Sequence, residues 1–423
     1  MVDAVTKATT SIRRGALIFY TQINLFGLGL LGFWTVINVL LLPTMAQDMA
    51  PASLTGSAVG LISVVGIGLA MIVQLVAGRA SDAWRHDDAR RPFIVAGLVL
   101  IVPGSAIFGF ASSFPLLLLG FVLLQVATNI SQAAFQALIP DLVDEDERGI
   151  ASGVKNGLSV LGAVVGLLGG EGLYALTNSA PVAVAYVALL LVVTGALTAY
   201  WAPKSSSPEG GDPGSIREAF SIPSMLDEFR QVLDTRVTFR LAVIAQFLFF
   251  LGTYPAQRFL LLFLEDRFGD DARIWVAVGG AAAILVAVIA AIAGGALSDV
   301  IGRRNVLIGS AVIGSSGLVL IGFAPTILIA GIAGSLIAVG LGAFQSVNWA
   351  LMNDDLPEGQ PAGALGIANV ATTGAGAVAG LFGPFADLVN AVAPAATYQA
   401  LFAVAGLIAV LSVLPLRRVV ESE

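Results

Sequence analysis

Long apolar runs separated by short polar loops repeat along the whole 423-residue chain. A helix that spans the hydrocarbon core of a membrane needs about 20 mostly apolar residues. Runs of that length occupy roughly residues 16–42, 54–77, 93–112, 115–139, 152–175, 181–201, 239–264, 274–297, 305–324, 326–352, 363–387 and 396–414. The pattern therefore predicts an all-α membrane protein with twelve transmembrane helices. The first run is too long for the apolar core of a signal peptide, so we expect it to be retained.

The polar loop after the second run returns in shortened form after the eighth. Residues 78–82 read GRASD and residues 295–299 read GALSD, and each loop then carries an arginine pair. From the arginines onward the two halves match at a constant offset of 213 residues. The matching positions are Arg90-Arg91 with Arg303-Arg304, Gln132 with Gln345, Asp141 with Asp354, and Asn156 with Asn369. A register kept over this length indicates an internal repeat of six helices.

This repeat predicts three parts of the chain. Residues 1–202 form an N-terminal six-helix bundle, residues 203–238 a cytoplasmic linker, and residues 239–423 a C-terminal six-helix bundle. The linker opens with the flexible polar tract KSSSPEGGDPGS. Ser224 can then cap an amphipathic helix with Met225, Phe229 and Val232 on one face. We expect this helix to lie on the membrane surface, and an ordinary tether is the alternative.

Composition narrows the class of protein. Hydrophobic residues make up 57% of the chain and charged residues only 12%, which leaves too little polar surface for a soluble protein of this size. The chain has no Cys and one His. Ser-His and Cys-His catalytic groups within the membrane are thereby excluded, so we expect no enzyme, no cofactor and no metal site. We also expect no nucleic-acid partner and a monomer.

The basic residues predict the orientation. All but Arg258, Arg267 and Arg273 of the 21 Lys and Arg fall on one side if the N-terminus is inside. Because cytoplasmic loops are enriched in Lys and Arg, both termini are expected in the cytoplasm and the protein in the plasma membrane.

The repeated loops resemble the signature of the major facilitator superfamily. Gly78-x-x-Ser81-Asp82 with Arg90-Arg91, and its counterpart at residues 295–304, are similar to that family's loops between helices 2 and 3 and between helices 8 and 9. Residues 90–94 (RRPFI) and 137–142 (ALIPDL) further resemble the sucrose-type and glycoside-type cation symporters. The resemblance implies two six-helix bundles, with helices 1, 4, 7 and 10 around a central pathway.

Buried amides gather on those four helices. In the fourth run Gln125, Asn129, Gln132 and Gln136 share one helical face. Because uncompensated amides are costly in hydrocarbon, they either line a wet cavity or hold helices together. Comparable residues on other helices complete the predicted substrate pathway: Asn24, Thr35, Asn38, Gln246, Tyr254, Gln257, Arg258, Gln345, Asn348 and Asn369.

Two further groups are assigned roles. A carboxylate at the end of a long helix can bind another helix's N-terminus or an arginine, and such a contact can form in one conformation and break in another. The predicted conformational latch consists of Gly78, Asp82, Arg90, Arg91, Gly295, Asp299, Arg303 and Arg304, with a static anchor as the alternative. Glu171 is the candidate for ion coupling and for pairing with Arg258; solute hydroxyls or water are the other candidate partners of Arg258.

These features favour a secondary transporter that moves a small polar solute by alternating access. A neutral solute rich in hydroxyls, such as a sugar, fits an amide-lined cavity better than a lipophilic cation, which would require a buried acid. Symport with H⁺ or Na⁺ is the leading expectation. A drug or metabolite exporter is the first alternative, and a membrane sensor or assembly factor on the same scaffold is the second.

Overall fold

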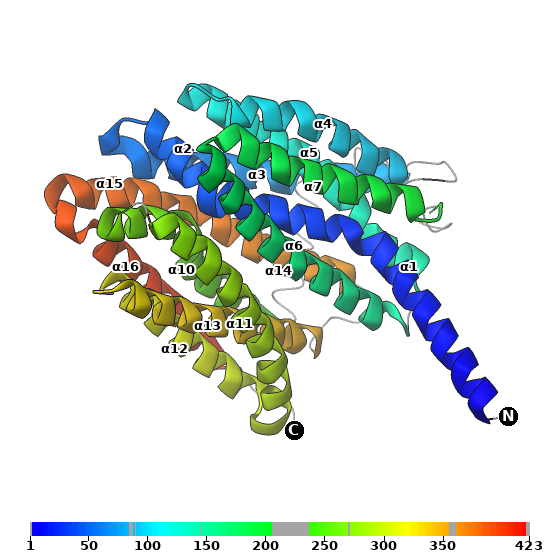
Figure 1. Cartoon of the computed structure of the whole chain (residues 1–423). Coiled ribbons are helices and arrows are strands. Elements are labelled where there is room, and N and C mark those ends of the chain that lie inside the picture. The colour runs from blue at the N-terminus through cyan, green and yellow to red at the C-terminus, as the bar shows by residue number, and fades with distance from the viewer. Residues whose placement is uncertain are drawn as a thin grey trace. The chain divides into compact units, whose positions relative to one another are not determined.

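The structure is a computed structural model of the whole chain, and it describes residues 2–83, 88, 90–144, 146–204, 237–269, 271–354 and 361–419. All the regular elements in these ranges are helices (Figure 1). Twelve of them are long and apolar enough to cross a membrane. The predicted fold class, an all-α membrane protein with twelve transmembrane helices, is confirmed. Most of the predicted linker helix, residues 224–233 included, lies outside the described residues.

The elements follow one another with short connections. The first half contains α1 (Val2–Val36), the π-helix η1 (Ile37–Leu41), α2 (Leu42–Met49), the 3₁₀-helix η2 (Ala52–Leu54), α3 (Thr55–Ala83), α4 (Arg91–Gly109), α5 (Phe114–Leu142), α6 (Arg148–Thr177) and α7 (Ala180–Trp201). The second half contains α10 (Val237–Phe268), α11 (Ala272–Ile301), α12 (Arg303–Gly322), α13 (Ile327–Asp354), α14 (Pro361–Val378), η3 (Ala379–Leu381), α15 (Phe382–Val392), η4 (Pro394–Ala396), α16 (Thr397–Val410) and α17 (Val413–Leu416).

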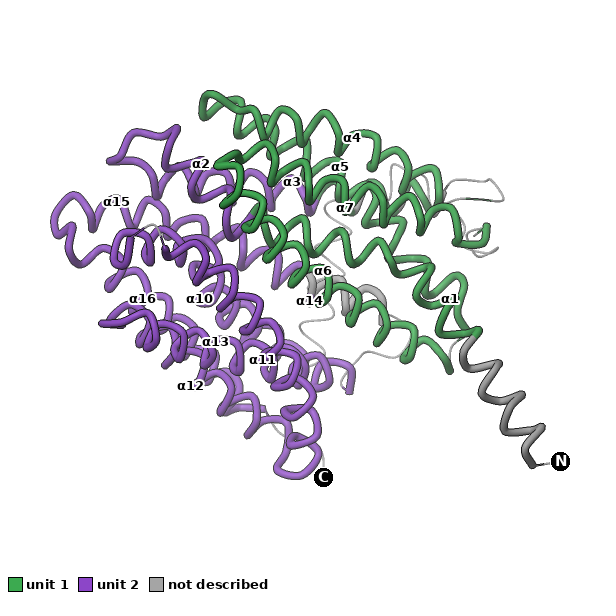
Figure 2. The backbone as a smooth tube through the Cα atoms, viewed as in Figure 1, with its two compact units in different colours: residues 1–37, 72–219 green, residues 38–71, 220–423 purple. Residues whose placement is uncertain are grey.

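The chain forms two compact units, drawn in different colours in Figure 2. Unit 1 comprises residues 1–37 and 72–219, and unit 2 comprises residues 38–71 and 220–423. Residues 38–71, which hold η1, α2, η2 and the first part of α3, thus pack with the second half of the sequence. The predicted domain boundaries at residues 202 and 239 stay a prediction.

The sequence repeat reappears in the packing within each unit. In unit 1, α4 packs on α5, and both α1 and α4 pack on α7. In unit 2, the corresponding α12 packs on α13, and both α10 and α12 pack on α16. The same helix pairs therefore form in both copies, as expected if the two halves descend from one six-helix pattern.

Small residues set the closest helix contacts. Gly162 and Gly166 of α6 lie against the backbone of α1, and a Cβ added to Gly162 would come within 1.9 Å of the Leu28 carbonyl oxygen. In unit 2, a Cβ added to Gly383 would come within 2.0 Å of the Gly56 carbonyl oxygen. No side chain fits at such positions. Small residues let two helix backbones approach closely, and this packing holds helices together in lipid, where the hydrophobic effect does not drive their association.

Candidate solute site and helix-end contacts

Arg258 is a guanidinium buried within unit 2. It lies in α10 with 9% of its surface exposed, and its Nη1 donates a 2.6 Å hydrogen bond to Oδ1 of Asn38. Asn38 belongs to η1, the π-helical segment that interrupts the first transmembrane helix. Short π-helical segments inside α-helices are frequent at functional sites, because the widened turn re-aims side chains. The two predicted pathway residues are thus brought together.

Two other predicted pathway residues share this part of α10. Tyr254 precedes Arg258 by one helical turn and is partly buried, whereas Gln257 is exposed. Pro255 lies between them, and a proline inside a helix removes one backbone hydrogen bond. The helix nevertheless continues without a break from Val237 to Phe268.

Gln246 and Asn348 of unit 2 form a network that leaves Oδ1 of Asn348 buried without a hydrogen bond among the described residues. Asn348 of α13 donates a 2.7 Å hydrogen bond to Gln246 of α10. Gln246 in turn donates to the Ala368 carbonyl and to Thr372, both on α14. The amides of Gln246 and Asn348 therefore join three helices, which gives them a packing role, and solute contact stays a prediction. Gln345 is exposed, and the side chain of Asn369 lies outside the described residues.

In unit 1 the polar stripe of α5 is divided. Gln125 and Asn129 are buried, and Nδ2 of Asn129 donates a 3.2 Å hydrogen bond to Oε1 of Gln125. The two amides therefore satisfy part of each other's hydrogen-bonding capacity. Gln136 is exposed and accepts a hydrogen bond from Gln74 of α3. Gln132 is half-buried. On hydrogen bonding alone, Gln132 is the member of the stripe best placed to serve a solute.

The two pathway residues of α1 bond to nearby backbone. Asn24 is fully buried and donates to the carbonyls of Tyr20 and Ala151, so it ties α1 to α6. Its Oδ1 is buried without a hydrogen bond. Thr35 donates to the Leu31 carbonyl one turn earlier. Neither residue's predicted contact with solute is tested by these bonds.

One ion pair of the repeated loops is common to the two units. Arg90 pairs with Asp141 at the end of α5, at 2.8 Å, and Arg303 pairs with Asp354 at the end of α13, also at 2.8 Å. All four residues are matched by the sequence offset of 213. Both copies of the repeat thus contain an ion pair between an arginine of the loop and an aspartate at the end of α5 or α13. Arg90 also donates to Ser81, which fixes the end of α3.

The other latch residues are placed less tightly. Arg91 pairs with Asp88 and donates to the Ala202 carbonyl. Asp299 is exposed, and Arg304 is the second residue of α12. Gly302 precedes this helix, and its φ of 89° explains the glycine in that loop. Gly78 and Gly295 are partly buried, and the Asp82 side chain lies outside the described residues. A latch formed by Asp82 and Asp299 stays a prediction.

Asp387 binds a helix N-terminus, a role that the sequence predicted for Asp82 and Asp299 and not for this residue. Asp387 of α15 accepts hydrogen bonds from the backbone N–H groups of Gly56 and Ser57, at 2.8 and 2.7 Å, where α3 begins. A carboxylate in this position satisfies unpaired backbone donors and the positive end of the helix dipole. The sequence placed Asp387 near a helix end, but nothing in it marked residues more than 300 positions earlier as the partner.

A second missed contact lies at the end of α10. Arg273, at the start of α11, pairs with Glu265 at 3.6 Å and donates to Thr44 of α2 at 2.9 Å. With Arg258 and Asp387, it is one of three charged residues that bind residues 38–57 to the second half of the sequence. These contacts accompany the close backbone packing of residues 38–71 within unit 2.

Glu171 is buried in α6, with 4% of its surface exposed. Burial of a carboxylate within a membrane-spanning helix is costly, which is consistent with the coupling role predicted for it. Glu171 belongs to unit 1 and Arg258 to unit 2, so their pairing stays a prediction.

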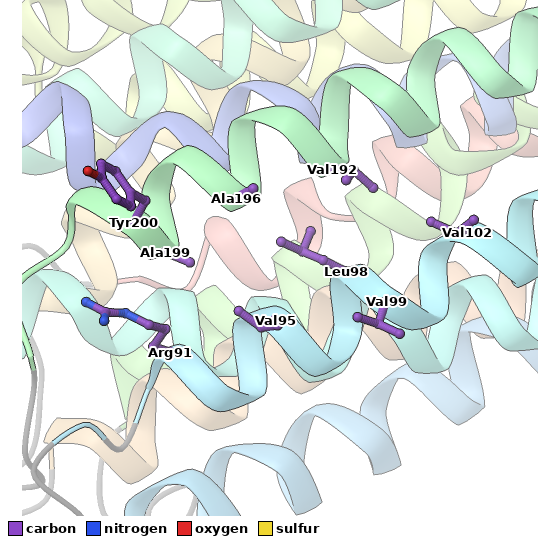
Figure 3. Close-up of a pocket in the computed structure, with 9 residues that line it drawn as sticks. All are labelled: Arg91, Val95, Leu98, Val99, Val102, Val192, Ala196, Ala199 and Tyr200. Carbon is purple, nitrogen blue, oxygen red and sulfur yellow. The ribbon is translucent and has the colours of Figure 1, made fainter.

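Figure 3 shows a groove in unit 1 between α4 and α7, with a volume of about 440 Å³. Arg91 and Tyr200 lie at the end where α4 begins and α7 ends, and valines such as Val99 and Val102 follow along α4. The aliphatic lining offers a polar solute almost no hydrogen bonds and is better suited to hydrocarbon. None of the predicted pathway residues lines this groove.

Comparison with known proteins places the chain in a family. The model of the Major Facilitator Superfamily matches residues 23–381. Among curated proteins no match is found.

Solved transporter structures share the fold at low sequence identity. A structure of the nucleoside transporter NupG, carrying one mutation, has a TM-score of 0.74 at 12% identity, over 94% of this chain and 99% of that one. The peptide transporter POT in complex with sulfate has a TM-score of 0.72 at 12% identity, over 95% and 93%. A bacterial homolog of the human lysosomal transporter Spinster has 0.66 at 16%, over 96% and 95%. The match over most of the sequence, together with twelve apolar helices in a repeated arrangement, shows that this chain is a multi-pass membrane protein that belongs to the Major Facilitator Superfamily.

Proposed function

We propose that the protein is a secondary transporter that moves a small polar solute across the plasma membrane by alternating access. The observation that carries this proposal is the repeat, which appears in the sequence, in the helix packing and in the paired Arg90–Asp141 and Arg303–Asp354 contacts. Internal repeats are the architecture of carriers whose two halves move around a site near the membrane midplane. The transporter structures that share this fold support the same reading.

The nature of the solute follows from the polar residues on the pathway helices. The buried amides Gln125 and Asn129 and the half-buried Gln132 offer both donors and acceptors, which suits hydroxyl groups. A sugar or a similar metabolite is the proposed solute, as in the sucrose-type and glycoside-type symporters that the loop motifs resemble. Coupling to H⁺ is assigned to Glu171, the buried carboxylate of α6.

The test is solute uptake by the purified protein in proteoliposomes. A panel of sugars, sugar derivatives, organic acids and amphiphilic drugs is offered with and without a pH gradient. The proposal predicts uptake of at least one polar solute, accelerated by an inward proton gradient and reduced when Glu171 is replaced by Gln. Movement of amphiphilic drugs alone would favour an exporter, and no flux for any solute would favour the sensor or assembly role.

A further inference from the structure

Among the described residues of unit 2, no carboxylate forms an ion pair with the guanidinium of Arg258. Its hydrogen-bond partner, Asn38, is neutral, and the ion pairs among the described residues do not include Arg258. An isolated cation in a low-dielectric interior is strongly unfavourable, and it is tolerated when an anion or polar acceptors are supplied. The structure therefore holds a positive charge whose balancing group is still to be identified.

Two acids of unit 2, Glu265 and Asp387, are bound to other groups. Glu265, about two turns after Arg258 on α10, pairs with Arg273. Asp387 accepts hydrogen bonds from the start of α3. Both carboxylates therefore have other partners, so a counter-charge for Arg258 is sought outside these contacts.

One edge of the guanidinium is left for a ligand. Nη1 is bonded to Asn38, whereas Nε and Nη2 make no hydrogen bond with the described part of the chain and are not sealed from solvent. The Nε and Nη2 donors form the side of arginine that receives a carboxylate through two parallel hydrogen bonds. The Asn38 bond holds the guanidinium in place, so the free edge is presented in a fixed direction.

The position of Asn38 is a second and independent observation. It lies in the π-helix η1, where the helical turn is widened. A π-helical segment costs stability relative to an α-helix and is retained mostly where it serves a function. Here the segment supplies the amide oxygen that orients the buried guanidinium of Arg258.

We propose that the transported solute carries a carboxylate, which binds the Nε–Nη2 edge of Arg258. One guanidinium balances one negative charge, so a monoanionic carboxylate fits better than a doubly charged phosphate. Tyr254, one turn away, offers a hydroxyl that can bond to the rest of the solute. The solute class is a small hydroxy acid, such as a sugar acid. This inference rests on the proposed transport function and narrows its solute, a sugar or a similar metabolite, to one that carries an acid group.

The experiment uses matched pairs of compounds that differ in the acid alone. Gluconate is compared with glucose, glycerate with glycerol, and lactate with lactamide, as ligands in thermal-shift assays of the full chain and as solutes in proteoliposomes. At least one acid is expected to raise the melting temperature and to be taken up, with its neutral partner at least tenfold weaker. Arg258→Gln should weaken that acid about tenfold to a hundredfold, the scale of a charge-assisted hydrogen bond. Arg258→Lys should fall between, because it keeps the charge and loses the paired donors.

A control variant and a ligand-free measurement complete the test. Arg267→Gln removes an exposed arginine from the same helix and should leave acid binding unchanged. Without ligand, Arg258→Gln should melt no lower than the unmodified protein, since it removes an uncompensated charge. A clear drop in melting temperature would show that the protein itself balances Arg258, and this would overturn the proposal. Uptake of neutral partners that is unaffected by Arg258→Gln would also overturn it while leaving the transport function intact.

Discussion

At the scale of single residues, the structure adds contacts that pair distant positions. The Asp387 carboxylate on the first N–H groups of α3 is the clearest case, because both of its oxygens accept a hydrogen bond. A carboxylate at a helix N-terminus contributes about 1–2 kcal/mol. Sequence spacing can place Asp387 at a helix end, but it cannot identify a partner that only the tertiary fold brings near.

Replacing Asp387 by Asn should therefore lower the free energy of unfolding by about 1–2 kcal/mol, since an amide oxygen can accept at one N–H group and carries no charge. Thermal unfolding in detergent measures the effect. Asp266→Asn, at an exposed position on α10, is the matched control and should leave the melting temperature within error. Equal changes in melting temperature for the two substitutions would contradict a helix-capping role for Asp387.

Glu171 offers the alternative counter-charge for Arg258. If the two pair, removing either charge alone leaves the other uncompensated, and the double variant should be more stable than the single variants lead one to expect. The measurement is a cycle of Glu171→Gln, Arg258→Gln and both, scored by melting temperature and transport. If the solute supplies the negative charge, the changes in melting temperature should be additive. Strong coupling between the two substitutions would instead identify Glu171 as the counter-charge of Arg258.

At the scale of helices, the sequence predicted the twelve spans and their order well. Hydrophobic length is sufficient for this, because the bilayer imposes it. The π-helix at Ile37–Leu41 and the 3₁₀ break at Ala379–Leu381 were not predicted, since each depends on what packs beside it. The shared polar face of α5 was predicted from helical spacing, but spacing alone did not show that Gln125 and Asn129 bond to each other.

This difference sharpens the prediction for α5. Gln132→Leu preserves bulk and removes an amide, and it should lower transport at least tenfold with little change in melting temperature. Asn129→Leu breaks the bond to Gln125 and should lower both. Uptake assays and thermal unfolding on the same preparations separate the two effects. Normal uptake by both variants would indicate that the polar residues of α5 serve helix packing and do not contact the solute.

At the scale of the whole molecule, the internal repeat was the most informative feature of the sequence. It predicted the fold, and the Arg90–Asp141 and Arg303–Asp354 pairs show that matched positions make matched contacts. It did not predict that residues 38–71 would pack with unit 2. The side-chain contacts of residues 38–57 within unit 2 come from Arg258, Arg273 and Asp387, none of which belongs to the repeated loop motif.

The proposed latch is tested by the balance between conformations. Asp82→Asn should shift that balance while the protein still folds, because the lost charge can no longer hold a helix end. The chain has no Cys, so single cysteines introduced at either end of the helices report accessibility to a thiol reagent. Unchanged labelling at both ends would reject the latch and favour a static anchor.

The most direct measurement of the central claim is solute flux through a protein that can be locked reversibly. The Ser57 N–H of α3 donates a 2.7 Å hydrogen bond to Asp387 of α15. The two residues lie in different halves of the internal repeat, and alternating access by movement of one half against the other requires such a contact to open in each cycle. Cysteines at both positions should form a disulfide on oxidation. The account predicts that uptake in proteoliposomes stops when the disulfide is formed and returns on reduction, while each single variant is unaffected by oxidant. Uptake at an unchanged rate through fully cross-linked protein would contradict it.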